Sequence, residues 1–134
     1  LLLSNYYPTA FIGLVDLKKK IIRYSNAGHL CPLLFSINKN EIIQIEEKNL
    51  MLGIKKDFEY QLFEKSLSSG DKFFIFTDGL IENISSIDQI KSYLKNNINN
   101  SLEKILDGVI EHTLNLSPEK KFYDDVTILS FEIK

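Results

Sequence analysis

The stretch KFFIFTDG, residues 72–79, gives the strongest indication of the fold. Its first five residues form an almost continuous apolar run, which predicts a strand buried on both faces. Asp78 follows at the end of this strand, where paired backbone groups hold a carboxylate in a fixed place. Gly79 has no Cβ, so another chain segment, a metal or a phosphate can come close. These features make Asp78 a candidate metal ligand, although Asp-Gly pairs are also common in plain turns.

A second acidic pair precedes another apolar run near the end of the sequence. Asp124 and Asp125 come directly before residues 126–131, VTILSF, which predict a strand. Carboxylates that converge on one site repel each other, and a hard divalent cation such as Mg²⁺ or Mn²⁺ offsets this repulsion. Asp78 and Asp124 are therefore a hypothetical metal-binding pair. On spacing alone, solvated turn acids are the more common interpretation.

Length and composition are typical of one modest globular domain. The chain has 134 residues, of which 44% are hydrophobic and 25% are charged, which is enough for one core. The net charge of −2 and the single arginine, Arg23, argue against nucleic acid as a partner. No apolar run reaches the roughly 18 residues of a membrane span, so we expect no membrane contact from this segment. The lone Cys31 allows no intrachain disulfide, which favours a cytoplasmic location.

The apolar patterns predict strands first, two helices next and one strand at the end. Such an order indicates an α+β fold, with helices on one face of an antiparallel sheet. Ser86 with Gln89 three residues later predicts a capping box at the start of the first helix, which a polar break at 95–100 would end. Apolar residues at helical spacing predict the second helix over 102–114. The expected strands are residues 9–15, 21–26, 33–37, 41–45, 58–64, 73–76 and 126–133.

Three further residues have side chains suited to chemistry. His29, beside Gly28, is a speculative general acid or phosphate contact; a locally hydrogen-bonded histidine at a tight strand exit is the more common interpretation. His112 falls off the apolar face of the second helix, where we expect it to be exposed. Cys31 precedes a proline and apolar residues rather than a phosphate-cradling loop, so we do not expect it to be a nucleophile.

Five segments, taken in order, resemble one known family over nearly the whole chain. Each is weak alone, but the order and spacing together resemble the SpoIIE/RsbU-like branch of the metal-dependent type-2C (PPM) serine/threonine phosphatases. The segments are TAFIGLVD at 9–16, YSNAGH at 24–29, SGDK at 69–72, FTDGLIE at 76–82 and YDDVTIL at 123–129.

This resemblance implies a fold, a chemistry and a partner. The fold would be an α-β-β-α sandwich of two antiparallel β-sheets flanked by helix pairs. Asp78 and Asp124 would be metal ligands, with Gly79 and Asp125 supporting them. Two Mn²⁺ or Mg²⁺ ions in the complete domain would activate a water that displaces phosphate directly. The substrate would be a phosphorylated protein, such as a STAS-domain anti-sigma-factor antagonist in bacterial partner-switching signalling.

One element of the family pattern has no counterpart in the sequence. The family carries a further Asp-Gly metal element near its N-terminus, in a stretch like GDVSGHG, and residues 1–134 contain no such stretch. We therefore expect residues 1–134 to be the C-terminal portion of a single phosphatase domain, and the isolated chain to have little or no activity. Unpaired sheet edges in such a portion would favour a homo-oligomer. The alternatives are a non-catalytic phosphoprotein-binding or signalling module and a structural α+β domain.

Overall fold

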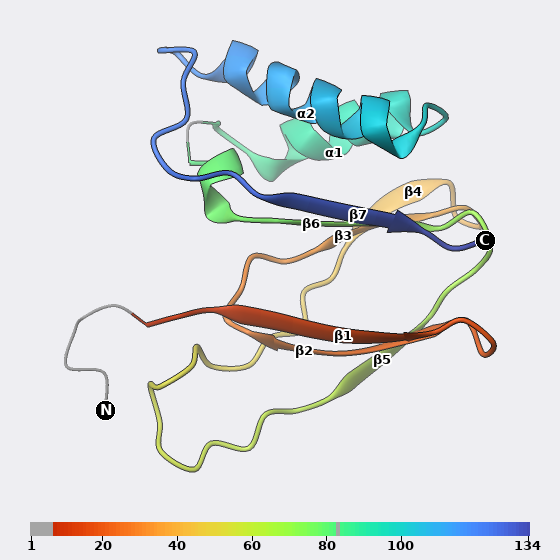
Figure 1. The fold of residues 1–134 in the computed structure, drawn as a ribbon, viewed down its shortest axis with the longest axis vertical. Helices are drawn as coiled ribbons and strands as arrows, with labels where there is room; N and C mark the ends of the chain where they lie inside the picture. Colours follow the sequence, from red (N-terminus) through yellow and green to blue (C-terminus); the bar gives the residue numbers. More distant parts are fainter. Residues whose placement is uncertain (1–6, 83) are drawn as a thin grey trace.

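The computed structural model describes residues 7–82 and 84–134 as three stacked layers, a helix pair and two antiparallel sheets (Figure 1). The α+β class and the antiparallel sheets are confirmed. The first sheet has the order β1-β2-β5, with bounds Ala10–Asp16, Ile21–Ala27 and Phe63–Ser66. The second has the order β4-β3-β6-β7, with bounds Glu41–Gln44, Leu33–Ser36, Lys72–Phe76 and Ile128–Glu132. The helices are η1 (Asp78–Leu80), α1 (Ile87–Asn97) and α2 (Leu102–Leu116).

Strand β6 lies inside the second sheet and is buried on both faces, as its apolar run predicted. Phe74 and Phe76 face the helices and pack with Leu80 in one cluster of buried residues. Phe73 points the other way, into the cluster between the two sheets, where its ring lies 6.2 Å from that of Phe11. Strand β6 is therefore packed on both faces and lies between β3 and β7, with β7 alone pairing its last two residues.

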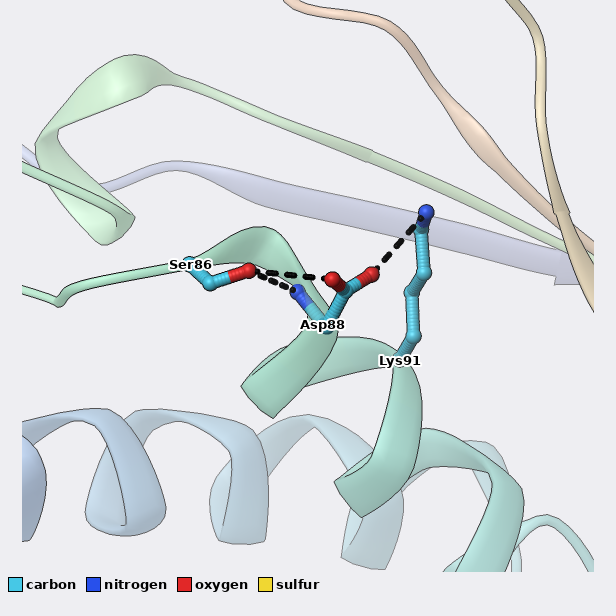
Figure 2. Close-up of polar contacts among 3 residues, drawn as sticks. All are labelled: Ser86, Asp88 and Lys91. Atoms are coloured by element: carbon cyan, nitrogen blue, oxygen red, sulfur yellow. Dashed lines mark hydrogen bonds and ion pairs between the residues drawn. The ribbon is translucent and has the colours of Figure 1, made fainter.

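Helix α1 begins where it was predicted to begin, with Ser86 as its N-cap, but the cap makes different hydrogen bonds. The hydroxyl of Ser86 accepts a hydrogen bond from the backbone N–H of Asp88 at 3.1 Å, and Asp88 pairs with Lys91 at 3.4 Å (Figure 2). The predicted capping box is wrong, because the side chain of Gln89 instead accepts a bond from the hydroxyl of Ser85. The helix also runs to Asn97, into the predicted polar break, where the Asn97 amide bonds the backbone carbonyl of Tyr93.

Two strands differ in extent from the sequence prediction. Residues 58–62 were expected to begin a strand, but β5 starts only at Phe63. The side chain of Asn49 bonds both the N–H of Gln61, at 2.9 Å, and its carbonyl, at 3.1 Å. A side chain thus takes the backbone groups that a strand neighbour would need. Strand β7 likewise starts at Ile128 rather than at residue 126, because the backbone N–H of Thr127 bonds the hydroxyl of Thr77, which directly follows β6.

The two sheets differ in how their outer faces are covered. The helix pair covers the outer face of the four-stranded sheet, with Ile105 and Val109 of α2 buried against it (Figure 1). No helix among residues 7–82 and 84–134 covers the outer face of the three-stranded sheet, where Ile12 is 73% and Leu14 69% exposed. The described residues thus form three of the four layers that the resemblance implies. None of the described helices has the length and apolar character needed to cross a membrane.

Candidate functional site

Two loops at one end of the four-stranded sheet carry the predicted acids, and one threonine ties the loops together. The backbone N–H of Thr77 bonds the carbonyl of Thr127 at 3.0 Å. The Thr77 hydroxyl accepts a bond from the N–H of Thr127 at 3.0 Å and donates one to the carbonyl of Asp125 at 3.1 Å. The segment after β6 is therefore fixed to the segment before β7. Sequence reasoning gave Thr77 no role, because its partners lie about 50 residues away.

Gly79 is where the two loops approach most closely. A Cβ added to Gly79 would lie 2.6 Å from the carbonyl oxygen of Asp125 and 3.1 Å from that of Asp124. Only glycine fits this contact without displacing backbone. Because Gly79 has no side chain, the backbone of the second loop can approach it. Asp78 and Asp124 therefore lie on adjoining segments.

Both candidate carboxylates are exposed and only locally bonded. Asp78 Oδ1 accepts a bond from the N–H of Gly79 at 3.1 Å, and Asp124 Oδ1 accepts one from the N–H of Asp125 at 2.7 Å. Among the residues that the structure describes, no three His, Cys, Asp or Glu side chains gather closely enough to hold a metal ion. Two carboxylates nevertheless suit Mg²⁺, which commonly takes one or two carboxylates and completes its shell with water and phosphate oxygens.

His29 sits at a tight exit from β2, as the simpler interpretation predicted. The buried side chain of Asn26 accepts a bond from the N–H of His29 at 2.7 Å and donates one to its carbonyl at 3.1 Å. Gly28 has φ of 70°, and a Cβ there would meet the side chain of Met51 at 2.2 Å. The imidazole Nδ1 is hydrogen-bonded to the hydroxyl of Thr9 at 3.3 Å.

The same histidine lines a pocket of about 230 Å³ that brings it together with Asp78. Burial lowers the pKa of His29; the charge of Asp78 acts against this shift and that of Lys48 adds to it. Lys48 also lines this pocket. Sequence reasoning missed Lys48, since a single lysine in a loop carries no pattern.

Other residues considered from the sequence lie outside this pocket. His112 is half-buried rather than exposed: its ring stacks on Tyr93 at 4.8 Å, and Gly108 makes room for the tyrosine. Asp71, the acid of the segment at 69–72, is buried and accepts bonds from the N–H groups of Ile37 and Ser68. Cys31 is buried.

Comparisons with known proteins identify relatives along the whole chain. The family model described as "Stage II sporulation protein E (SpoIIE)" matches residues 2–134. "Phosphoserine phosphatase RsbU" of Bacillus subtilis (strain 168) is 24% identical over 131 residues, which cover 94% of this chain and 39% of RsbU. "Stage II sporulation protein E" of the same organism is 20% identical over 134 residues, which cover 97% of this chain and 16% of that protein. The chain thus spans well under half the length of either relative.

Solved structures show the same fold. The SpoIIE phosphatase domain from Bacillus subtilis, presoaked with Mn, has a TM-score of 0.74 at 17% identity, covering 93% of this chain and 56% of that one. The SiaA-PP2C domain of Pseudomonas aeruginosa has a TM-score of 0.78 at 19% identity, with coverage of 94% and 52%. The serine/threonine phosphatase PstP/Ppp of Mycobacterium tuberculosis has a TM-score of 0.72 at 15% identity, with coverage of 96% and 60%. The architecture is that of part of a PP2C phosphatase domain.

Proposed function

The chain belongs to the SpoIIE family, and on that basis we propose that it forms part of a metal-dependent phosphoserine/phosphothreonine protein phosphatase. The observation that carries the proposal is the tie between the two acidic loops. Thr77 and Gly79 hold the segment of Asp78 against the segment of Asp124, although the two acids are 46 residues apart in the sequence. RsbU, a relative along nearly the whole chain, is named a phosphoserine phosphatase.

In this proposal Asp78 and Asp124 hold Mn²⁺ or Mg²⁺, and Asp125 supports the site through the backbone carbonyl that Thr77 binds. The bound ion supplies Lewis-acid chemistry, since it lowers the pKa of a coordinated water and offsets negative charge on phosphate. Hydrolysis breaks the bond between phosphorus and the ester oxygen. The serine or threonine hydroxyl leaves, and water supplies the fourth oxygen of the phosphate.

Two carboxylates are too few for the binuclear site that the resemblance implies. The 134-residue chain by itself is therefore expected to have little or no activity, and an Asp-Gly element elsewhere in the full-length protein would complete the site. We further propose that the full-length protein acts in the cytoplasm on a phosphorylated STAS-domain anti-sigma-factor antagonist.

A non-catalytic phosphoprotein-binding or signalling module is the second candidate. It is favoured by one observation, that no three potential metal-binding side chains gather among the described residues. The sequence upstream of residue 1 separates the candidates. An Asp-Gly metal element there favours the phosphatase, and a replaced aspartate favours the module.

The test is hydrolysis of a phosphoserine peptide by the full-length protein, with and without Mn²⁺. We expect Mn²⁺-dependent release of phosphate, and losses of about 100-fold or more in kcat for Asp78→Asn and Asp124→Asn. Glu119→Gln is the matched control, because Glu119 is a nearby exposed acid that pairs only with Lys121 among the described cations. Hydrolysis that both aspartate variants retain would refute the proposal.

A further inference from the structure

We propose that Lys48, assisted by His29, is the phosphate-binding side of the pocket that Asp78 lines, and that it selects phosphomonoesters presented on a side chain. The inference rests on the proposed function and deepens it, because it assigns substrate recognition to residues outside the metal-binding pair.

The size and composition of the pocket favour a small anionic group. Its volume of about 230 Å³ is below the roughly 300–1,000 Å³ typical of pockets for whole small molecules. It suits the end of a phosphorylated side chain, with the rest of the substrate outside. The lining offers the hydroxyls of Thr9 and Thr77 and the imidazole of His29 as hydrogen-bonding groups.

Charge singles out Lys48 within this lining. Among the described residues that line the pocket, Lys48 is the only cation and Asp78 the only carboxylate. The ammonium of Lys48 therefore adds to the bound metal ion in offsetting the repulsion between a phosphate dianion and Asp78. Among the described residues no acid lies within ion-pair distance of that ammonium, so it is available to a ligand. Arg23, the only arginine, is committed to Glu64 at 2.8 Å on the outer face of the three-stranded sheet.

The backbone around Lys48 is fixed on both sides. Glu47 accepts a bond from the hydroxyl of the buried Tyr24 at 3.0 Å. The N–H of Asn49 donates a hydrogen bond to the carbonyl of Asn26 at 2.7 Å, and Asn49 forms an isolated parallel β-bridge with Ala27. Lys48 itself is exposed. The exposed side chain of Lys48 thus extends from a hydrogen-bonded backbone segment beside the pocket, where its ammonium can bind a phosphate.

His29 adds a hydrogen-bonding group to the charge of the lysine. Its backbone is locked by Asn26, and its ring is positioned by Thr9. His29 and Lys48 line the same pocket, so we assign both to one bound anion. We assign Lys48 the larger share of affinity, since hydrogen bonds to charged groups are the stronger ones.

The experiment compares Lys48→Gln, Lys48→Arg and Lys39→Gln in the full-length protein at saturating Mn²⁺. Lys39→Gln is the matched control, because Lys39 is an exposed hairpin lysine outside the pocket. Each variant is assayed for KM and kcat with a phosphoserine peptide and for inhibition by inorganic phosphate. We expect Lys48→Gln to raise KM and the phosphate inhibition constant about 10- to 100-fold, with kcat little changed. Lys48→Arg should keep most of the affinity, and Lys39→Gln all of it.

Unchanged KM and phosphate inhibition in Lys48→Gln would overturn the assignment. So would an equal loss of Mn²⁺ affinity, which would make the lysine part of the metal site instead. Direct titration with inorganic phosphate by calorimetry separates this inference from the proposed function. If the wild-type protein hydrolyses nothing, the phosphatase proposal fails, while weaker phosphate binding by Lys48→Gln than by Lys39→Gln still supports the pocket.

Discussion

The two sheets of this protein are built from similar hairpins, yet among residues 7–82 and 84–134 only the four-stranded sheet is covered on both faces. Its strand β6 has Phe74 at 1% exposure under the helices, whereas Ile12 on the outer face of the three-stranded sheet is 73% exposed. Phe76 at the end of β6, two residues before Asp78, is buried under the helices, while the outer face of β1 contributes little to the core. Stability therefore depends mainly on the helix-covered half, whereas the candidate site draws on both halves, since its pocket joins Asp78 after β6 with His29 after β2.

The largest expected effect is a cavity under the helices. Phe74→Ala removes a ring buried between the sheet and the helix pair, so we expect it to lower the free energy of unfolding by about 3–5 kcal/mol. Chemical denaturation measures this directly. A loss below about 1 kcal/mol would mean that the helices do not pack on β6 as described.

The second-largest effect is expected at Gly79, where the backbones of the two acidic loops are in contact. Gly79→Ala places a Cβ 2.6 Å from the carbonyl oxygen of Asp125 and must push the two acidic loops apart. We expect a loss of about 1–3 kcal/mol and weaker Mn²⁺ binding. Gly13→Ala is the control, since its Cβ would meet side-chain atoms of Ile22 and Phe11 at 3.3 Å rather than backbone. Equal effects of the two changes would remove the special role of Gly79.

The pH dependence of stability probes the contact between the sheets and the loop that carries Lys48. Burial, with the hydrogen bond to Glu47 and that carboxylate's charge, raises the pKa of Tyr24 above its ordinary 10.0. The unfolded chain then loses its proton first, so stability falls as the pH rises above about 10. The pKa of Glu47 is lowered, first by its own backbone N–H and then by Tyr24, so its contribution is lost as the pH falls through that lowered value.

Tyr24→Phe isolates this contact. We expect a loss of about 1 kcal/mol at neutral pH, with a smaller decline of stability on both the alkaline and the acid side. Thermal unfolding between pH 3 and pH 11 measures it. Unchanged pH profiles would contradict the hydrogen bond between Tyr24 and Glu47.

The smallest effect is expected on the outer face of the three-stranded sheet. Leu14→Ser changes a side chain that is 69% exposed, so the free energy of unfolding should stay within about 0.5 kcal/mol. Self-association, which the sequence predicts from uncovered sheet surface, should decrease in light scattering. A large destabilisation by Leu14→Ser would show that this face is buried in the protein as it exists in solution.

Elements defined by local patterns were predictable from the sequence. The apolar run of β6 gave a strand buried on both faces, and the helical spacing of Ile105 and Val109 gave the face of α2 that packs on the sheet. Elements set by distant side chains were not predictable. The amide of Asn49 delays the start of β5, and nothing in the local sequence indicates its bonds to Gln61.

The residues of the candidate site also divide into those that a local pattern predicts and those that depend on distant contacts. Asp78 was identified because it follows an apolar run and Asp124 because it precedes one, and the structure confirms that their loops adjoin. Their role as metal ligands stays a prediction. The bonds of Thr77 and the position of Lys48 depend on contacts between segments far apart in the chain, which no local pattern reports.

Calorimetric titration of the full-length protein with Mn²⁺ tests the central claim most directly. It compares wild type with Asp78→Asn and Asp124→Asn, and uses Glu119→Gln as the control. We expect each aspartate change to weaken Mn²⁺ binding about 100-fold or more, while Glu119→Gln binds as wild type does. Wild-type affinity in both aspartate variants would show that these two acids are only solvated turn residues.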